Sequence, residues 1–375
     1  MKKAYINNLR GLDLLRFLLS VSVIIWHYQH FFYPFISFEK REVFLTKQPF
    51  FHFFELFYTK GYYAVQVFWL ISGVIFYKIY QQNISLGKIR LPQFMLNRFS
   101  RLYPLHLLTL FIVIGLQFWY NSEYGRYFIY EKNGAQSFFQ NLLFVQAWGD
   151  NRLSFNGPTW SVSIEIMVYL VFFGICASGL IRTSWGLIGV FIFFMMIKKW
   201  ELLFAGDDLS SSIYLFFAGC LLTRVYDMVA QNRLQQSGIL LILFISWYST
   251  QHTPRIIEPL YERVTGFLYP DLLTFSLLSV WIFIVVFSHQ FFDRVPDSVF
   301  RFFGDMTYST YLIHFPIQLL MFLLLKPESY STFFAPWVFV IYLLVVFALG
   351  QLTFRFFEVP VQNKLRELLK RSKIS

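Results

Sequence analysis

The chain has 375 residues, of which 57% are hydrophobic and only 14% are charged. Soluble domains are usually about 45–50% apolar and about 25% charged, so this composition excludes an ordinary soluble protein. The formal net charge of +11 therefore indicates membrane topology and contact with anionic lipid, and not nucleic acid binding. The two cysteines, Cys176 and Cys220, lie in apolar runs and form neither a metal-binding spacing nor a disulfide framework.

Apolar runs of spanning length recur along the chain and predict an all-α integral membrane protein, a bundle of about ten transmembrane helices. Lys and Arg are more frequent on the side that holds both termini, which places both termini in the cytoplasm. The N-terminal residues lack a short apolar core followed by a cleavage site, so we expect the first helix to be retained. The runs are 9–33, 61–80, 101–120, 159–181, 184–199, 211–229, 238–250, 271–290, 306–325 and 333–357.

The segments outside these runs add little that resembles a separate soluble domain. Two long outer segments, 34–60 and 121–158, are rich in Tyr, Phe, Asn and Gln. They fit a lid or an acceptor platform, or the commoner role of interfacial aromatic belts. The chain divides into a transmembrane domain, 1–360, and a basic cytoplasmic tail, 361–375, which we expect to bind anionic headgroups.

The first run carries five ionisable residues, Arg10, Asp13, Arg16, His27 and His30. Ionisable groups inside a spanning helix are costly and usually mark a site. Arg16 and His27 fall within about 20° of each other on one helix face, roughly 16 Å apart along the axis. The alternative is that the arginines snorkel to the headgroups while His27 lies near the opposite interface.

The third run opens with NRFSRLYPLH, in which Arg98 and Arg101 are three residues apart on one helix face. Arg16 is expected at a similar depth. Three guanidinium groups at one inner rim would suit a polyphosphate, because Arg binds phosphate through planar, paired donors. The alternative is ordinary positive-inside charge at a helix start.

The fourth run opens with GPTWSVSIEIMVYL, and Glu165 lies roughly 8–9 Å inside the membrane. His27 is expected at a similar depth, where a carboxylate would orient the imidazole and raise its basicity. Ser161 and Tyr169 flank Glu165 on the same helix face. The alternative is an interfacial glutamate held by water or a backbone donor.

Two further runs contain polar or small residues at membrane depth. Ser72 and Gly73 would let another helix or a ligand approach the backbone, and plain helix packing is the alternative. His314 lies beside Pro316, which interrupts the helical hydrogen bonds. It is either a structural histidine or part of a cavity wall.

Taken together, these motifs resemble the membrane acyltransferase-3 family of bacterial O-antigen, exopolysaccharide and Nod-factor O-acetylases. The motifs RGLDLLR with Arg16-x10-His27, GYYAVQVFWLISG, NRFSRLYP, TWSVSIEIMVY, GDMTYSTYLIHFP and FFEVP occur in the family's order. The resemblance covers about residues 8 to 360. It implies ten transmembrane helices that move an acyl group, usually acetyl from cytoplasmic acetyl-CoA, onto an extracytoplasmic sugar hydroxyl. It also implies essential roles for Arg16, His27, Arg98 and Arg101, and maps the family's Ser-Gly pair onto Ser72 and Gly73.

The sequence departs from the family pattern in two places. The family often has an acidic residue before the Phe-Phe of the second helix, where this chain has Ala64, Val65 and Gln66. Glu165 or Asp13 would then have to supply any carboxylate that the reaction needs. Many relatives carry a C-terminal hydrolase-like domain, and this sequence resembles the stand-alone form.

We therefore expect a membrane O-acyltransferase, most simply an O-acetyltransferase, in the bacterial cytoplasmic (inner) membrane. His27, supported by Glu165, would act as general base or carry the acyl group transiently. Arg10, Arg16, Arg98 and Arg101 would bind acyl-CoA. Other residues expected to bind substrate or support the site are Ser72, Gly73, Trp160, Ser161 and His314.

The expected partners are acyl-CoA as donor, a glycan or lipid-linked sugar as acceptor, and the lipid bilayer. No metal, permanently bound cofactor or nucleic acid is expected. An alternative function is a multi-span transporter or flippase for a lipid-linked sugar, whose signature would be broken helices at matching positions of two halves. A third is a membrane protein that only recognises a glycan.

Overall fold

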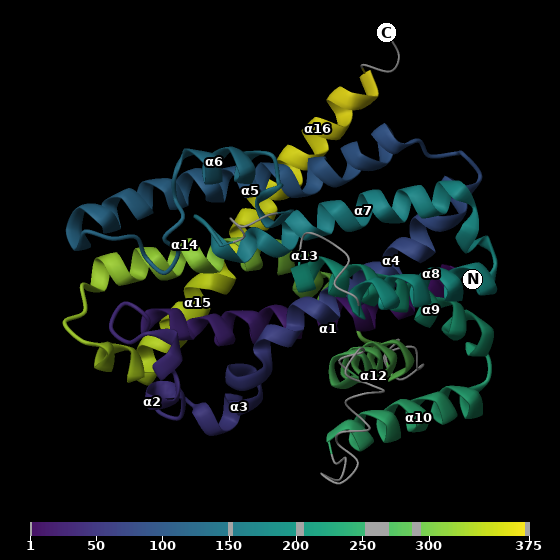
Figure 1. Cartoon of the computed structure of the whole chain (residues 1–375), viewed down its shortest axis with the longest axis horizontal. Coiled ribbons are helices and arrows are strands. Elements are labelled where there is room, and N and C mark those ends of the chain that lie inside the picture. The colour runs from purple at the N-terminus through teal and green to yellow at the C-terminus, as the bar shows by residue number, and fades with distance from the viewer. Residues whose placement is uncertain (1, 149–152, 200–205, 252–269, 287–293, 372–375) are drawn as a thin grey trace. The chain divides into compact units, whose positions relative to one another are not determined.

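The computed structural model describes residues 2–148, 153–199, 206–251, 270–286 and 294–371, and every element in these ranges is helical. Figure 1 shows this arrangement, which confirms the predicted all-α class. The longer helices are α1 (Lys2–His27), α3 (Phe51–Lys60), α4 (Ala64–Ser85), α5 (Leu91–Tyr124), α7 (Trp160–Ser178), α8 (Ser184–Lys199), α9 (Gly206–Val229), α10 (Arg233–Gln251), α12 (Pro270–Val286), α14 (Thr307–Leu325), α15 (Pro336–Thr353) and α16 (Val359–Arg371). The shorter ones are α2 (Glu42–Leu45), α6 (Ala135–Leu142) and α13 (Asp297–Asp305).

Each of the ten predicted runs coincides with one of these helices. Within the described part of the chain, seven helical stretches are long and apolar enough to cross a membrane: Arg10–Phe31, Phe51–Ser85, Leu91–Tyr124, Gly157–Ser178, Asp208–Val229, Asp297–Leu325 and Pro336–Leu368. Ten spanning helices and cytoplasmic termini stay predictions. Residues 287–290 of the eighth run and 372–375 of the tail lie outside the described residues.

Helix α5 is longer than its apolar run, because it begins at Leu91 and not near residue 101. Pro92 lies in its first turn, where a missing N–H costs nothing. The first three turns interleave polar and charged residues with apolar ones, which is why hydropathy alone placed the helix start too late. Arg98 and Arg101 therefore lie inside α5 and not at its opening.

The chain forms two compact units. The first unit contains Met1–Arg16, Val65–Leu91 and Ile164–Gly304. In it, α4 and α9 pack closely, because a Cβ on Gly73 would overlap the carbonyl group of Phe216. A Cβ on Gly219 would likewise overlap the carbonyl of Leu70. Small residues let helix backbones approach in this way, so Gly73 has the packing role given above as the alternative.

The second unit contains Phe17–Ala64, Pro92–Ser163 and Asp305–Ser375. Helices α14 and α15 pack against each other, as Figure 1 shows in its left half. An aromatic core joins them to the chain after α1. The Phe31 and Phe333 rings stack at 4.4 Å, and the Phe32 and Phe44 rings at 4.6 Å. This core holds the end of α1, where His27 is the last helical residue.

Candidate active site

His27 has a fixed ring orientation, set by the backbone of its own helix. Its Nδ1 atom lies 2.9 Å from the carbonyl oxygen of Val23, one turn earlier. A carbonyl oxygen can only accept a hydrogen bond, so in the neutral ring Nδ1 carries the proton. The lone pair is then on Nε2. Because the His27 side chain is half-buried, this ring combines a fixed tautomer with partial access from outside.

Two buried histidines lie next to His27. Its ring centroid is 4.8 Å from that of His30 and 4.9 Å from that of His314. His30 is 4% exposed and His314 is fully buried, which leaves His27 the most accessible of the three. The Trp26 ring lies 4.9 Å from the His27 ring on another side. The three histidine rings and the Trp26 ring thus form one cluster at the end of α1.

His314 is held in place by the same kind of contact as His27. Its Nδ1 atom lies 2.5 Å from the carbonyl oxygen of Tyr311, so Nδ1 carries the proton. Its buried Nε2 atom has no hydrogen-bond partner among the described residues. Pro316 cannot donate to the carbonyl of Leu312, and the side-chain amide of Asn156 donates to that oxygen at 2.9 Å. This bond compensates for the proline, so α14 continues past His314.

One face of α14 organises the site, because Tyr311, His314 and Gln318 recur at helical spacing. The Gln318 amide donates to the backbone carbonyl of His27 at 3.0 Å, which anchors the end of α1. The Tyr311 hydroxyl donates to the carbonyl of Pro158 at 2.7 Å and lies 2.8 Å from the Ser161 hydroxyl. Ser161 therefore supports α14 one turn from His314. Trp160, beside it, is half-buried at the first position of α7.

Arg98 and Arg101 belong to the same unit as His27 and are half-buried. The Tyr308 hydroxyl donates to the carbonyl of Leu102 at 2.7 Å, which joins the first turn of α14 to the helix turn that carries the arginines. His314 lies six residues farther along α14, roughly 9 Å at 1.5 Å per residue. The arginine pair of α5 thus lies beside the first turn of α14, and the histidines lie farther along α14.

Glu165 has two partners in the first unit. The Ser72 hydroxyl donates to its Oε1 at 3.3 Å, and the Tyr169 hydroxyl donates to the same oxygen. The same-face placement of Tyr169 is thus confirmed. The carboxylate therefore accepts one hydrogen bond from α4 and one from its own helix, α7.

Arg10 and Arg16 each contact a carboxylate in the first unit. The Arg10 guanidinium pairs with Asp297 of α13 and lies 6.0 Å from the Phe300 ring centroid. Arg16 lies 3.3 Å from Asp13, three residues earlier on α1. Each pair lowers the net positive charge that these arginines offer to a ligand.

The predicted site residues are therefore divided between the two units. The second unit brings together His27, His314 and Ser161. Arg98 and Arg101 belong to the same unit and lie beside the first turn of α14. The pairing of His27 with Glu165 stays a prediction, and the contact described for the His27 ring is the Val23 carbonyl. The residues in the first unit are Arg10, Arg16, Ser72, Gly73 and Glu165.

Sequence reasoning did not assign His30, Tyr311 or Gln318 to the site. A local signal existed, because each lies three or four residues from His27 or His314, the spacing of neighbours on a helix face. Gln318 and His27, however, are 291 residues apart, and no local pattern predicts that contact.

Comparison with known proteins gives one family and one relative. The family model described as "Acyltransferase domain" matches residues 9–355. Acyltransferase MdmB of Streptomyces mycarofaciens is 32% identical over 119 residues, which cover 30% of this chain and 28% of the relative. The matched part thus spans less than a third of the curated relative's length. No solved structure matches the chain.

Proposed function

Because the chain belongs to this acyltransferase family, the acyltransferase-3 family that its motifs resemble, we propose that it is a membrane O-acyltransferase. It moves an acyl group, in the first instance acetyl, from cytoplasmic acyl-CoA to a hydroxyl group of an extracytoplasmic glycan. The similarity to an acyltransferase and the repeated apolar helices support this class of enzyme. The bacterial inner membrane is the proposed location.

The observation that carries the proposal is the tautomer of His27, which leaves the lone pair on Nε2 because Nδ1 is bonded to the Val23 carbonyl. As the acceptor oxygen attacks the thioester carbon, Nε2 takes the hydroxyl proton. The new C–O bond forms, the C–S bond breaks, and the CoA thiolate leaves. The imidazolium of His27 then returns the proton to that thiolate, giving free CoA and neutral His27.

A second route begins from the same lone pair. Nε2 attacks the thioester carbon and displaces the CoA thiolate, which leaves the acyl group on the His27 ring. The acceptor hydroxyl then attacks the acyl-imidazole, loses its proton to the thiolate and frees Nε2. Both routes need Nδ1 to remain protonated and oriented, and the Val23 carbonyl provides that contact.

The donor phosphates fit Arg98 and Arg101, because guanidinium groups bind phosphate oxygens through paired donors. From that level the thioester arm would extend along α14 toward His314 and His27. The assignment of Arg16 to the donor stays a prediction, and its guanidinium lies 3.3 Å from the Asp13 carboxylate. Arg10 is paired with Asp297, which supports a structural role for it more than a phosphate contact.

The test is acyl transfer by the full-length protein in membrane vesicles. We expect acetyl-CoA to release CoA only when glycan from the host cell envelope is supplied, with the label appearing as an ester on that glycan. Mass spectrometry of cell-surface glycans with and without the gene identifies the acceptor. Glycan translocation with no ester formed would contradict the proposal and favour a flippase.

A further inference from the structure

A cluster of aromatic and polar side chains lies at the end of α1, beside His27, and none of its members has been given a role in transfer. Arg41 comes from the segment between α1 and α3, and its Cζ lies 6.0 Å from the Trp26 ring centroid. The Trp26 ring is in turn 4.9 Å from the His27 ring and 6.5 Å from the His30 ring. The Tyr33 ring belongs to the same cluster, with its centroid 5.4 Å from that of the His30 ring. Arg41 is thus one indole ring away from the proposed base.

The cluster contains donors without acceptors. Besides the Nδ1 atom of His30, which donates or accepts according to its tautomer, three buried polar atoms of the cluster lack a hydrogen-bond partner among the described residues: the Arg41 Nε, the Trp26 Nε1 and the Tyr33 hydroxyl. All three can donate, and Trp26 Nε1 and the guanidinium can do nothing else. Buried polar groups are normally bonded, so each exception needs an explanation.

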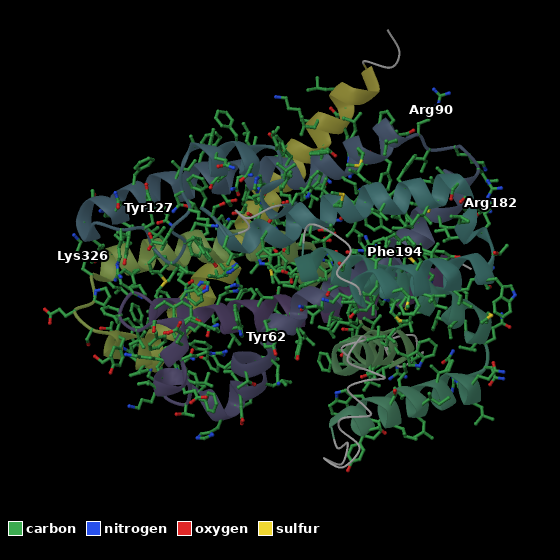
Figure 2. The ribbon with its side chains drawn as sticks, in the orientation of Figure 1. Tyr62, Arg90, Tyr127, Arg182, Phe194 and Lys326 are labelled. Carbon is green, nitrogen blue, oxygen red and sulfur yellow. The ribbon has the colours of Figure 1, made fainter. Side chains whose placement is uncertain are left out.

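The charge of Arg41 is not balanced by a carboxylate within 4.0 Å in the described ranges of the chain. Its guanidinium donates to the backbone carbonyl of Tyr58 and lies near the phenol rings of Tyr33 and Tyr62. Tyr62, labelled in Figure 2, is 38% exposed and borders the cluster, with its ring 6.2 Å from that of Trp26. A half-buried cation among aromatic rings is costly unless an anion joins it.

The protonation states of Tyr33 and Arg41 keep both side chains as hydrogen-bond donors. Burial raises the pKa of the Tyr33 phenol well above its usual range, so the hydroxyl keeps its proton and remains a donor. Burial lowers the pKa of Arg41, and a guanidinium still stays charged at neutral pH. The site therefore offers one positive charge and several unused donors.

We propose that Arg41, Tyr33 and Trp26 form a binding site for an anionic group of the acceptor, a carboxylate or a phosphate, which positions the acceptor hydroxyl at His27. This proposal rests on the acyl transfer proposed above and assigns a substrate class to it, an acidic glycan or a phosphate-linked sugar. Charge-assisted hydrogen bonds from a guanidinium fork suit both groups.

The experiment measures binding, so it does not depend on transfer. The thermal transition of the full-length protein in detergent is followed against inorganic phosphate, glucuronate and glucose at constant ionic strength. We expect phosphate or glucuronate to stabilise the protein and glucose to have no effect. Which of the two binds more tightly distinguishes a phosphate-linked from an acidic acceptor.

Variants assign that binding to the cluster. Arg41→Gln should weaken anion affinity roughly ten- to a hundredfold, and Tyr33→Phe, which keeps the ring, should weaken it by less. Arg126→Gln is the matched control, because Arg126 is an exposed arginine of the same unit. If Arg41→Gln lowers the melting temperature even without anion, its affinity cannot be compared with that of the wild type. The anion affinity of Tyr33→Phe then tests the site.

Two results would overturn the proposal: no anion stabilises the wild type, or the variants bind anions as the wild type does. Anion binding by a wild-type protein that transfers no acyl group to any glycan supplied would leave this site intact and remove only the proposed function. With acidic acceptors in hand, Arg41→Gln should raise KM and leave kcat nearly unchanged. A loss confined to kcat would assign Arg41 to the transition state and contradict an acceptor site.

Discussion

Charged side chains in the two units have different surroundings. In the first unit three cations lie beside carboxylates: Arg10 pairs with Asp297, Arg16 lies 3.3 Å from Asp13, and Lys78 lies 3.8 Å from Asp227. The second unit has the exposed pair Lys326–Glu123 at 3.0 Å, but its half-buried Arg41 lies against Trp26 and a backbone carbonyl, beside histidines with unbonded buried nitrogens. Matched charges hold helices together, whereas unmatched charges and donors retain the capacity to bind a ligand.

The largest effect that this comparison predicts is at His27. His27→Ala should lower glycan-dependent CoA release by about 10²–10⁴-fold, the usual contribution of a general base. The protein should still insert and melt normally, because α1 remains anchored through the backbone carbonyl that accepts from Gln318. The measurement is the rate of CoA release from acetyl-CoA in vesicles.

His52→Ala is the control for that variant, because His52 is an exposed histidine of α3 in the same unit. It should transfer acyl groups at the wild-type rate. Full activity in His27→Ala would remove the mechanism.

The next effect concerns donor binding. Arg98→Ala should raise the KM for acetyl-CoA roughly ten- to a hundredfold, since a charge-assisted contact to phosphate is lost. The KM for the acceptor should change little. Initial rates measured over a range of both substrates test this, with Arg90→Ala as the control, because Arg90 is exposed where Figure 2 labels it. A larger effect on the acceptor than on the donor would argue against the arginine pair as the CoA site.

A stability effect is predicted in the first unit. Gly73→Ala should destabilise the protein by about 1–3 kcal/mol, because the new methyl group would overlap the Phe216 carbonyl. Gly174→Ala is the matched control, since a Cβ there meets nothing within 4 Å, and it should stabilise α7 by about 0.5–1 kcal/mol. Thermal melting in detergent compares the two. Equal melting temperatures would contradict the close approach of α4 and α9.

The smallest effect is the coupling between Arg10 and Asp297. The Asp297 side chain is 35% exposed, so solvent weakens the pair, and a double-mutant cycle should give about 1 kcal/mol. The cycle is measured as stability from Arg10→Ala, Asp297→Ala and the double variant. Neither single variant should change the KM for acetyl-CoA. A marked rise in that KM for Arg10→Ala alone would indicate that Arg10 binds the donor.

Much of the fold was predictable because bilayer-length apolar runs report helices directly. Hydropathy fails where a helix is not continuously apolar, as in the first turns of α5, which mix polar and apolar residues and were left out of the predicted run. The α4–α9 contact had a sequence signal in Gly73, but its partner Gly219 could not be identified, since a small residue does not specify what it packs against.

The candidate site was predictable as a list of ionisable residues inside helices, and His27 and His314 are indeed neighbours. What orients them was not predictable. The Val23 contact depends on a side-chain rotamer, and the Gln318 contact depends on how two distant helices pack. Arg41 was missed because it lies in an irregular segment, where charge is expected to face water.

The central claim is that the Nε2 atom of His27 carries the lone pair that performs the transfer. Nitrogen-15 NMR of protein labelled at histidine side chains, with His27→Ala to assign the signal, reports which ring nitrogen is protonated. The account predicts the neutral tautomer with the proton on Nδ1, held by the Val23 carbonyl. A proton on Nε2, with Nδ1 as the free acceptor, would contradict it.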